Sequence, residues 1–192
     1  MNIAFDIDGV LTDLQRFMFD YGYQFFKTNI KNPSSYYTSE MFGFPKERDD
    51  DFWCQFGKFY FTKYPVRDGV IETINKLKSD GHSIYFITHR NEKAAFYCSV
   101  SMDEYKEIVK TWFKSVGIDP INIIHCDGSK LPKCLENDIK IIIEDKAENV
   151  LELSEHIKVI CFDAYYNHNI SGNNILRCYS MFEVCDIINK MF

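Results

Sequence analysis

Four acidic side chains stand in two pairs, and each pair ends an apolar run. Asp6 and Asp8 end the first run of the chain, and Glu144 and Asp145 end a later, β-branched run. Uncompensated charge at the end of a buried strand costs several kcal/mol, so we expect these carboxylates to face a cation or to exchange protons. Their oxygens suit a hard divalent ion such as Mg²⁺. The plainer interpretations are a turn for the first pair and a helix cap for the second.

A hydroxyl and two basic side chains follow a third apolar run, residues 83–88. Thr88 at the end of this run is well placed to hold a phosphoryl oxygen, although threonine also occurs in strands for its strand propensity alone. For His89 and Arg90 a solvated loop is the ordinary interpretation. The alternative is that they contact an anionic substrate.

A lysine occurs where a helix is expected to begin. Ser129 is a suitable cap for that helix, and Lys130 follows it. The first turn of a helix favours acidic residues, so a lysine there is unusual unless a phosphate binds beside it. Lys133 is the other candidate for the same role.

Hydrophobic periodicity and turn residues outline alternating strands and helices. We expect strands at 2–7, 83–88, 121–125, 139–145 and 158–162. We expect helices at 14–28, 47–61, 70–78, 103–116 and 180–191, and another that opens at 146–149. Residues 17–25 alternate strictly enough to allow a strand instead, and residues 91–102 are expected to be irregular.

The chemistry-bearing residues fall into four motifs. FDIDGVLTD at residues 5–13 resembles DxDGxxxD, the first motif of the haloacid dehalogenase superfamily. The run that ends in Thr88 resembles the second motif, in which the hydroxyl and the next backbone N–H bind phosphate. Lys130, 15 residues before Asp145, is similar to the lysine of the third motif, and IIIEDKAEN resembles the fourth.

The resemblance implies a role for each of these positions. Asp6 would attack phosphorus, and Asp8 would protonate the leaving oxygen and later activate water. The resemblance implies a Mg²⁺ site at Asp6, Asp8 and Asp145 with Glu144 behind it, and a phosphate site at Thr88, His89 and Lys130. Arg90 is a candidate substrate contact from its position alone. Residues 163–167 are similar to the F-D-x-P-Y-N ending of nucleotidase-like members but depart from it at Ala164 and Tyr165, so Asn167 receives no role.

The fold class that follows is α/β. We expect a Rossmann-like three-layer sandwich with a central parallel sheet and a small helical cap inserted after the first strand. The core would comprise residues 1–13 and 66–192, and the cap residues 14–65. The cap is rich in aromatic residues, most of which we expect to form its own small core. A few could stack on a flat substrate group.

The function that follows is a Mg²⁺-dependent phosphomonoesterase that forms an aspartyl-phosphate. The chain looks most like 5′(3′)-deoxyribonucleotidase-type proteins, which implies a nucleoside monophosphate as substrate. A sugar or amino-acid phosphate is the alternative. More remote alternatives are a receiver-like signalling domain and a non-catalytic protein that binds a phosphorylated ligand.

Composition indicates the class of partner, the location of the protein and the state of its cysteines. The chain has 192 residues, 46% hydrophobic and 26% charged, with a net charge of −6 and scattered basic residues. We therefore expect a small-molecule phosphate ester as partner and no nucleic acid polymer. No run is apolar enough to span a membrane and there is no room for a leader, so a cytoplasmic location is expected. The seven cysteines are an odd number without C-x-x-C spacing and should be reduced.

Overall fold

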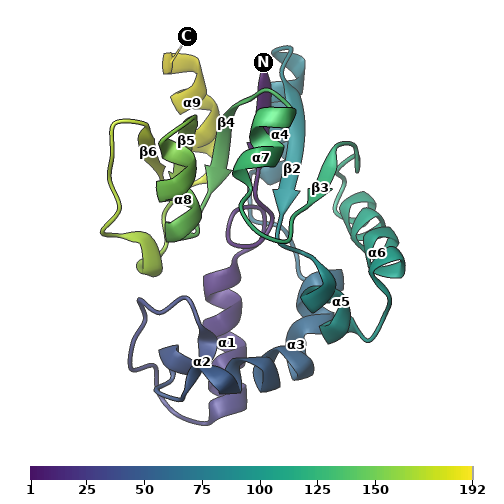
Figure 1. Ribbon diagram of the computed structural model, residues 1–192, viewed down its shortest axis with the longest axis vertical. Coiled ribbons are helices and arrows are strands. Elements are labelled where there is room, and N and C mark those ends of the chain that lie inside the picture. The colour runs from purple at the N-terminus through teal and green to yellow at the C-terminus, as the bar shows by residue number, and fades with distance from the viewer. Residues whose placement is uncertain (192) are drawn as a thin grey trace.

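The computed structural model describes residues 1–191 as a sheet covered by helices, with a further group of helices beyond one edge of the sheet (Figure 1). The strands are β1 (Asn2–Phe5), β2 (Ser83–Thr88), β3 (Ile123–His125), β4 (Ile139–Glu144), β5 (Lys158–Phe162) and β6 (Ile175–Cys178). The helices are α1 (Leu14–Phe26), α2 (Thr38–Met41), α3 (Asp49–Lys63), α4 (Val70–Ser79), α5 (Glu92–Cys98), α6 (Met102–Ser115), α7 (Leu131–Glu136), α8 (Ala147–Ser154) and α9 (Met181–Met191). Two short 3-10 helices are η1 (Lys46–Arg48) and η2 (Tyr165–Asn167).

The sheet has six strands in the order β3-β2-β1-β4-β5-β6. Every neighbouring pair runs parallel, and β1 lies between β2 and β4, with Phe5 opposite both Phe86 and Ile143. Parallel strands require crossover connections, which here contain helices. The predicted Rossmann-like parallel sheet is confirmed.

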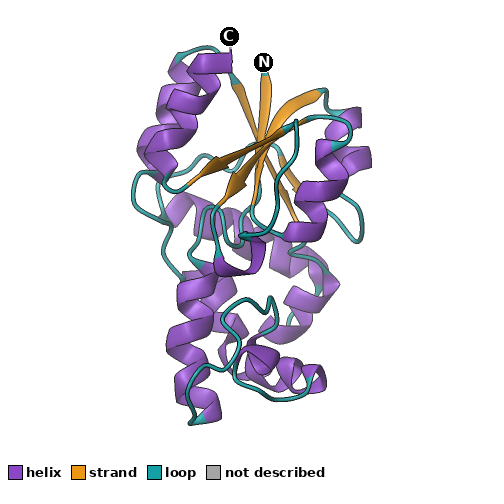
Figure 2. Ribbon diagram, turned by 90° about the vertical axis from the view of Figure 1, so that its left-hand side faces the viewer, coloured by secondary structure: helices purple, strands orange, loops and turns teal. Residues whose placement is uncertain are grey.

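Helices cover both faces of the sheet because alternate strand residues point to opposite sides. Ile3 and Phe5 pack with buried residues of α4, α6 and α9, whereas Ala4 packs with those of α7 and α8. All three of these β1 side chains are 0% exposed. The molecule therefore has the expected three layers (Figure 2).

The helical segment 14–65, which contains α1, α2, η1 and α3, lies beyond the carboxyl edge of the sheet (Figures 1 and 2). Its centre is aromatic: the Phe17 ring lies 4.5 Å from that of Tyr60 and 6.0 Å from that of Phe52, measured between centroids. All three side chains are 0% exposed. Most of the aromatic residues thus form a small core, as expected.

The predicted helix at 14–28 is confirmed as α1, which Asp13 caps by accepting a hydrogen bond from Arg16 N, and the alternative of a strand at 17–25 is wrong. Two local features differ from the prediction. The stretch 91–102, expected to be irregular, contains α5, whose side chains Ala95 and Tyr97 are buried. Strand β6, at the edge of the sheet, was not predicted, because it is short and only one of its four residues is buried, which leaves no clear apolar run.

Two further expectations concern membrane-spanning helices and the cysteines. Among residues 1–191 no helix combines the length and apolarity needed to cross a membrane. All seven cysteines are free thiols.

Candidate active site

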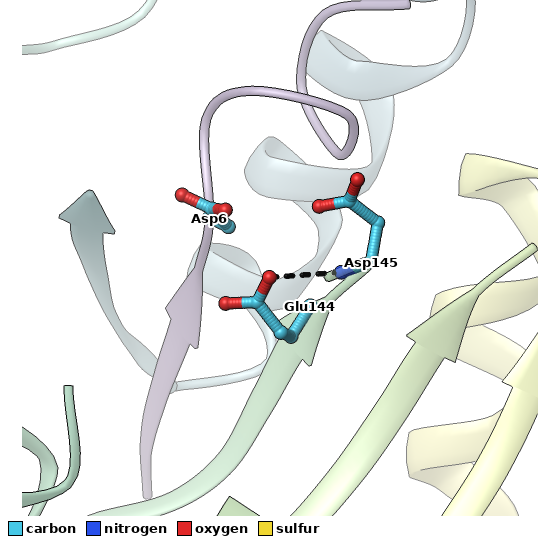
Figure 3. A group of neighbouring side chains, drawn as sticks. All are labelled: Asp6, Glu144 and Asp145. Atoms are coloured by element: carbon cyan, nitrogen blue, oxygen red, sulfur yellow. Dashed lines mark hydrogen bonds between the residues drawn. The ribbon is translucent and has the colours of Figure 1, made fainter. Parts of the chain in front are cut away.

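Three neighbouring strands bring the predicted residues to one edge of the sheet. Asp6 directly follows β1, Thr88 ends β2, and Glu144 ends β4. Because these strands are parallel and adjacent, their carboxyl ends meet, and ligands of open α/β sheets bind at that edge. Figure 3 shows the carboxylates of Asp6, Glu144 and Asp145 gathered there, supplied by the ends of β1 and β4.

These three carboxylates are buried and close together. One oxygen of each lies within 4.8 Å of the others, and the residues are 6%, 0% and 1% exposed in the order Asp6, Glu144, Asp145. Gly9 makes room for them, because its φ is 92° and a Cβ at this position would lie 1.9 Å from Asp145 Oδ2. Glycine is therefore required for this approach of the turn to the cluster.

Lys130 is the cation inside the cluster. Its Nζ lies 2.9 Å from Asp6 Oδ2 and 2.6 Å from Glu144 Oε2, and its side chain is 0% exposed. Lys133, the rival candidate, points into solvent and pairs with Glu136. The structure therefore places Lys130, and not Lys133, beside the acidic residues.

Burial and repulsion shift the proton affinities of the cluster. Burial, followed by the charge of Glu144, raises the pKa of Asp6 well above its usual value. The same two causes raise the pKa of Asp145 to about 8. Burial also acts to raise the pKa of Glu144, but the ion pair with Lys130 outweighs it and the pKa is lowered. Without a further cation, the cluster is therefore expected to retain protons that a metal ion would displace.

The donor set fits a hard divalent cation. Asp145 Oδ1 is buried and has no hydrogen-bond partner among the described residues. Glu144 is already occupied, since Oε2 binds Lys130 and Oε1 accepts the backbone N–H groups of Asp145 and Lys146 at 3.1 and 2.9 Å. Asp6 and Asp145 are thus the carboxylates best placed to ligate a metal, with Glu144 holding Lys130 behind them.

Asp8 lies next to the cluster and is held by Arg90. The guanidinium donates to the Asp8 carboxylate from Nε at 3.1 and 3.2 Å and from Nη2 at 2.8 Å. The side chain of Asp8 is 19% exposed and that of Arg90 is 0% exposed. The solvated loop considered for Arg90 is therefore wrong, and its guanidinium has no exposed surface in this structure.

The predicted phosphate residues Thr88 and His89 lie at the end of β2. Thr88 is 0% exposed, and its Oγ1 accepts the backbone N–H of Arg90 at 3.1 Å, which leaves its own proton for another acceptor. The His89 ring donates from Nε2 to the carbonyl of Gly128 at 2.6 Å, so it is partly buried and not a freely solvated loop residue. Burial, followed by the charge of Lys130, lowers the pKa of His89, which favours the neutral ring at pH 7.

A cavity of about 300 Å³ adjoins Asp8 and is lined from two sides. The helical segment 14–65 contributes Trp53 and Phe61, among others, and α5 contributes Tyr97. The rings of Phe61 and Tyr97 stack with centroids 6.4 Å apart and an interplanar angle of 5°. The cavity thus combines an acidic end with flat aromatic walls.

Sequence reasoning missed several residues that hold Asp145. The hydroxyl of Tyr166 donates to Asp145 Oδ2, and Asn167 Nδ2 donates to the carbonyl of Asp145 at 2.7 Å. The ring of Tyr36, from the loop between α1 and α2, packs on Tyr166 at 5.2 Å. The only signal for Asn167 was the imperfect F-D-x-P-Y-N ending, and nothing in the sequence pointed to Tyr36.

Comparison with known proteins supports the same assignment. The chain matches the family model for 5′ nucleotidase, deoxy (pyrimidine), cytosolic type C protein over residues 1–192. It is 30% identical over 195 residues to a nucleotidase of Clostridium acetobutylicum, covering 100% of this chain and 95% of the relative.

Solved structures share the fold. A haloacid dehalogenase-like protein from Agrobacterium tumefaciens matches with a TM-score of 0.64 at 12% identity, covering 99% of this chain and 98% of the other. D,D-heptose 1,7-bisphosphate phosphatase from B. bronchiseptica matches with a TM-score of 0.58 at 10% identity, covering 100% and 99%. With the carboxylates, lysine and threonine at one sheet edge, these matches lead to one conclusion: the chain belongs to the cytosolic type C 5′-nucleotidase family of the haloacid dehalogenase superfamily and is a phosphoric monoester hydrolase.

Proposed function

We propose that this hydrolase is a Mg²⁺-dependent phosphatase of nucleoside monophosphates that works through an aspartyl-phosphate. The observation that carries the proposal is the position of Asp6, which lies beside Lys130 and within 4.8 Å of the other cluster carboxylates. A nucleophilic carboxylate, a cation for the phosphoryl oxygens and a second acid two residues away are the groups that such a reaction needs.

The two steps use Asp6 and Asp8 in turn. An oxygen of Asp6 attacks phosphorus, the bond from phosphorus to the ester oxygen breaks, and that oxygen takes a proton from Asp8. Asp8 then accepts a proton from a water molecule that attacks the same phosphorus, which releases inorganic phosphate and restores Asp6. The Asp6 carboxylate is held in place for this by Ile7 N–H at 2.7 Å and by Lys130 at 2.9 Å.

The remaining polar groups balance the charge that develops on the phosphoryl oxygens. We assign this role to Lys130, the hydroxyl of Thr88 and the backbone N–H of His89. Lys130 remains charged because its two carboxylate partners outweigh burial and raise its pKa. A phosphoryl group that approaches Asp6 therefore meets a fixed positive charge.

Mg²⁺ would be held by the carboxylates of Asp6 and Asp145 and by the backbone carbonyl of Asp8. When bound, it offsets the charge of the acidic cluster and draws electron density from the phosphoryl group. Charge supports a divalent ion: four carboxylates (Asp6, Asp8, Glu144, Asp145) and two basic side chains (Lys130, Arg90) leave two negative charges when all are ionised. The heptose bisphosphate phosphatase of the same fold was solved with magnesium and phosphate.

The cavity beside Asp8 supports a nucleoside as the group that carries the phosphate. A base that enters it would lie beside the rings of Trp53, Phe61 and Tyr97, and stacking on an aromatic ring contributes about 1–3 kcal/mol per base. The description of the matched family names a deoxy pyrimidine nucleotidase, which points to the same substrate class.

This cavity also supports the proposed division into a core (1–13 and 66–192) and a cap (14–65), because its lining comes from both parts. Since the motif residues at the sheet edge lie around the phosphoryl position, we assign the choice of substrate to the cap. We further propose a cytoplasmic location, which the free cysteines support.

Phosphate release from three esters tests the substrate. We expect kcat/KM for a pyrimidine deoxynucleoside 5′-monophosphate to exceed that for glucose 6-phosphate or phosphoserine by roughly tenfold or more, the factor that one stacking contact provides. An equal or reversed preference would leave the phosphatase chemistry standing and assign the enzyme to the sugar or amino-acid phosphates.

A further inference from the structure

Arg90 joins two parts of the molecule that the proposed mechanism treats separately. Its Nε and Nη2 bind the carboxylate of Asp8, while its Nη1 donates to the carbonyl oxygen of Phe61 at 3.1 Å. Asp8 belongs to the turn after β1, and Phe61 lies in the last turn of α3. One fully buried guanidinium thus touches both the proposed proton donor and the helical segment 14–65.

The carbonyl of Phe61 needs an outside donor because of the local sequence. The last four carbonyls of a helix lack intrahelical partners, and the residue four positions after Phe61 is Pro65, which has no N–H. A cation at the carboxyl end of a helix is also favoured by the helix dipole. Arg90 therefore caps α3 from the opposite part of the chain.

The rest of Arg90 is fixed by the core. Its backbone N–H donates to Thr88 Oγ1 at 3.1 Å, and its carbonyl accepts from His125 Nδ1 at 2.6 Å. The guanidinium lies 4.7 Å from the ring centre of Trp112, and Trp112 Nε1 donates to the carbonyl of Tyr64 just beyond α3. Because the backbone and the guanidinium of Arg90 are both held, the orientation of the guanidinium is fixed before any substrate binds.

We propose that Arg90 is a positioning residue that orients the Asp8 carboxylate for proton transfer while α3 is docked on the core. This inference rests on the proposed role of Asp8. Arg90 acts through Asp8 and through the end of α3, and it does not touch the substrate. If α3 moves away from the core, the guanidinium loses its hydrogen bond to the carbonyl of Phe61. The position of the helical segment is therefore coupled to the orientation of the Asp8 carboxylate.

Two esters of similar shape separate this role from a purely structural one. Phenolate needs a proton to leave phosphorus more than 4-nitrophenolate does, so phenyl phosphate depends more on Asp8 than 4-nitrophenyl phosphate does. We expect Arg90→Lys to lower kcat/KM for phenyl phosphate by roughly tenfold more than for 4-nitrophenyl phosphate, part of the range that general acid catalysis contributes. An equal fall for both esters, or no fall, would overturn the proposal.

Arg67→Lys is the matched control. Arg67 also binds an aspartate and a main-chain carbonyl, those of Asp13 at 2.8 Å and Gly9 at 3.2 Å, but it does not contact Asp8. We expect this variant to leave the ratio between the two esters unchanged. Failure of the wild-type protein to release phosphate from these esters and from a nucleoside monophosphate would instead refute the proposed function, so the two failures are distinguishable.

Hydrogen exchange tests the link to α3 without an activity measurement. Asp8→Asn weakens the hold on Arg90, and we expect the amides in the last turn of α3 to exchange about threefold faster or more, a local loosening of the docked helix. Asp13→Asn retains the helix-capping oxygen of α1, and it should leave the exchange rates in the last turn of α3 unchanged. Identical exchange of the turn in both variants would contradict the coupling.

Discussion

A single methyl group at Gly9 would displace a carboxylate of the acidic cluster without removing any charged residue. In Gly9→Ala the new Cβ would lie 1.9 Å from Asp145 Oδ2, 2.3 Å from its Cγ and 2.7 Å from its Oδ1. Real Cβ contacts are longer than 3.0 Å, so the whole carboxylate of Asp145 would have to move by about 1 Å or more. All ionisable groups of the site would remain present.

Two effects follow, and their sizes differ. A left-handed conformation costs an alanine roughly 1–2 kcal/mol, which lowers the melting temperature of a domain of this size by roughly 2–8 °C. Displacement of a group in the site by about 1 Å costs on the order of 100-fold in rate. We therefore expect Gly9→Ala to be a folded protein with kcat/KM reduced about 100-fold and with weaker Mg²⁺ binding.

Substitutions at two other glycines separate the effect of backbone strain from the effect of displacing Asp145. Gly81 and Gly117 have φ values of 84° and 83°, and a Cβ at either would meet nothing within 4 Å. Gly81→Ala and Gly117→Ala should therefore show the same backbone strain with unchanged activity. The measurements are melting temperature, kcat/KM for a nucleoside monophosphate, and the Mg²⁺ concentration at half activity. Activity of Gly9→Ala within threefold of Gly81→Ala would refute the reasoning.

Two further predictions concern the cation. Chelator-treated protein should be inactive, regain activity with Mg²⁺, and regain little with Ca²⁺, whose looser coordination tolerates the wrong geometry; full activity in excess chelator would exclude the proposed mechanism. In metal-free protein the pKa of Asp145 is about 8 when folded against 3.8 when unfolded, so the folded state binds the additional proton between these values and stability falls as pH rises. Melting curves should show this fall between pH 5 and pH 8, at up to about 1.4 kcal/mol per pH unit for this group. Asp145→Asn or added Mg²⁺ should reduce this dependence of stability on pH. An unchanged dependence in both cases would count against the raised pKa of Asp145.

The residues at the strand ends were predictable because parallel strands leave little freedom. Once the apolar runs before Asp6, Thr88 and Glu144 are assigned to one parallel sheet, their carboxyl ends must meet. The sequence favoured Lys130 through its spacing to Asp145, but it left Lys133 open as the rival. The choice depends on where α7 begins, and with Leu131 as its first residue Lys130 lies just before the helix, facing the cluster.

Other features depend on distant contacts that no local pattern encodes. Tyr36 reaches the site from an irregular loop and packs on Tyr166, more than a hundred residues later. The bond from Arg90 to the carbonyl of Phe61 follows from the absence of an N–H at Pro65, but only the docked position of α3 reveals it. Helix α5, in contrast, had local signals that were overlooked, since Asn91 caps it and Glu92, Lys93, Ala94 and Ala95 are good helix formers. Burial of residues such as Tyr97 against α3 adds to its stability.

The central claim is that Asp6 carries the phosphoryl group during turnover. Borohydride reduces an aspartyl-phosphate to homoserine, so treatment of the protein during turnover marks the nucleophile, and mass spectrometry of the N-terminal peptide identifies the position. We expect homoserine at residue 6 when substrate and Mg²⁺ are both present, and unmodified aspartate at that position when either is omitted. Reduction at Asp8 or Asp145 with residue 6 intact would contradict the account.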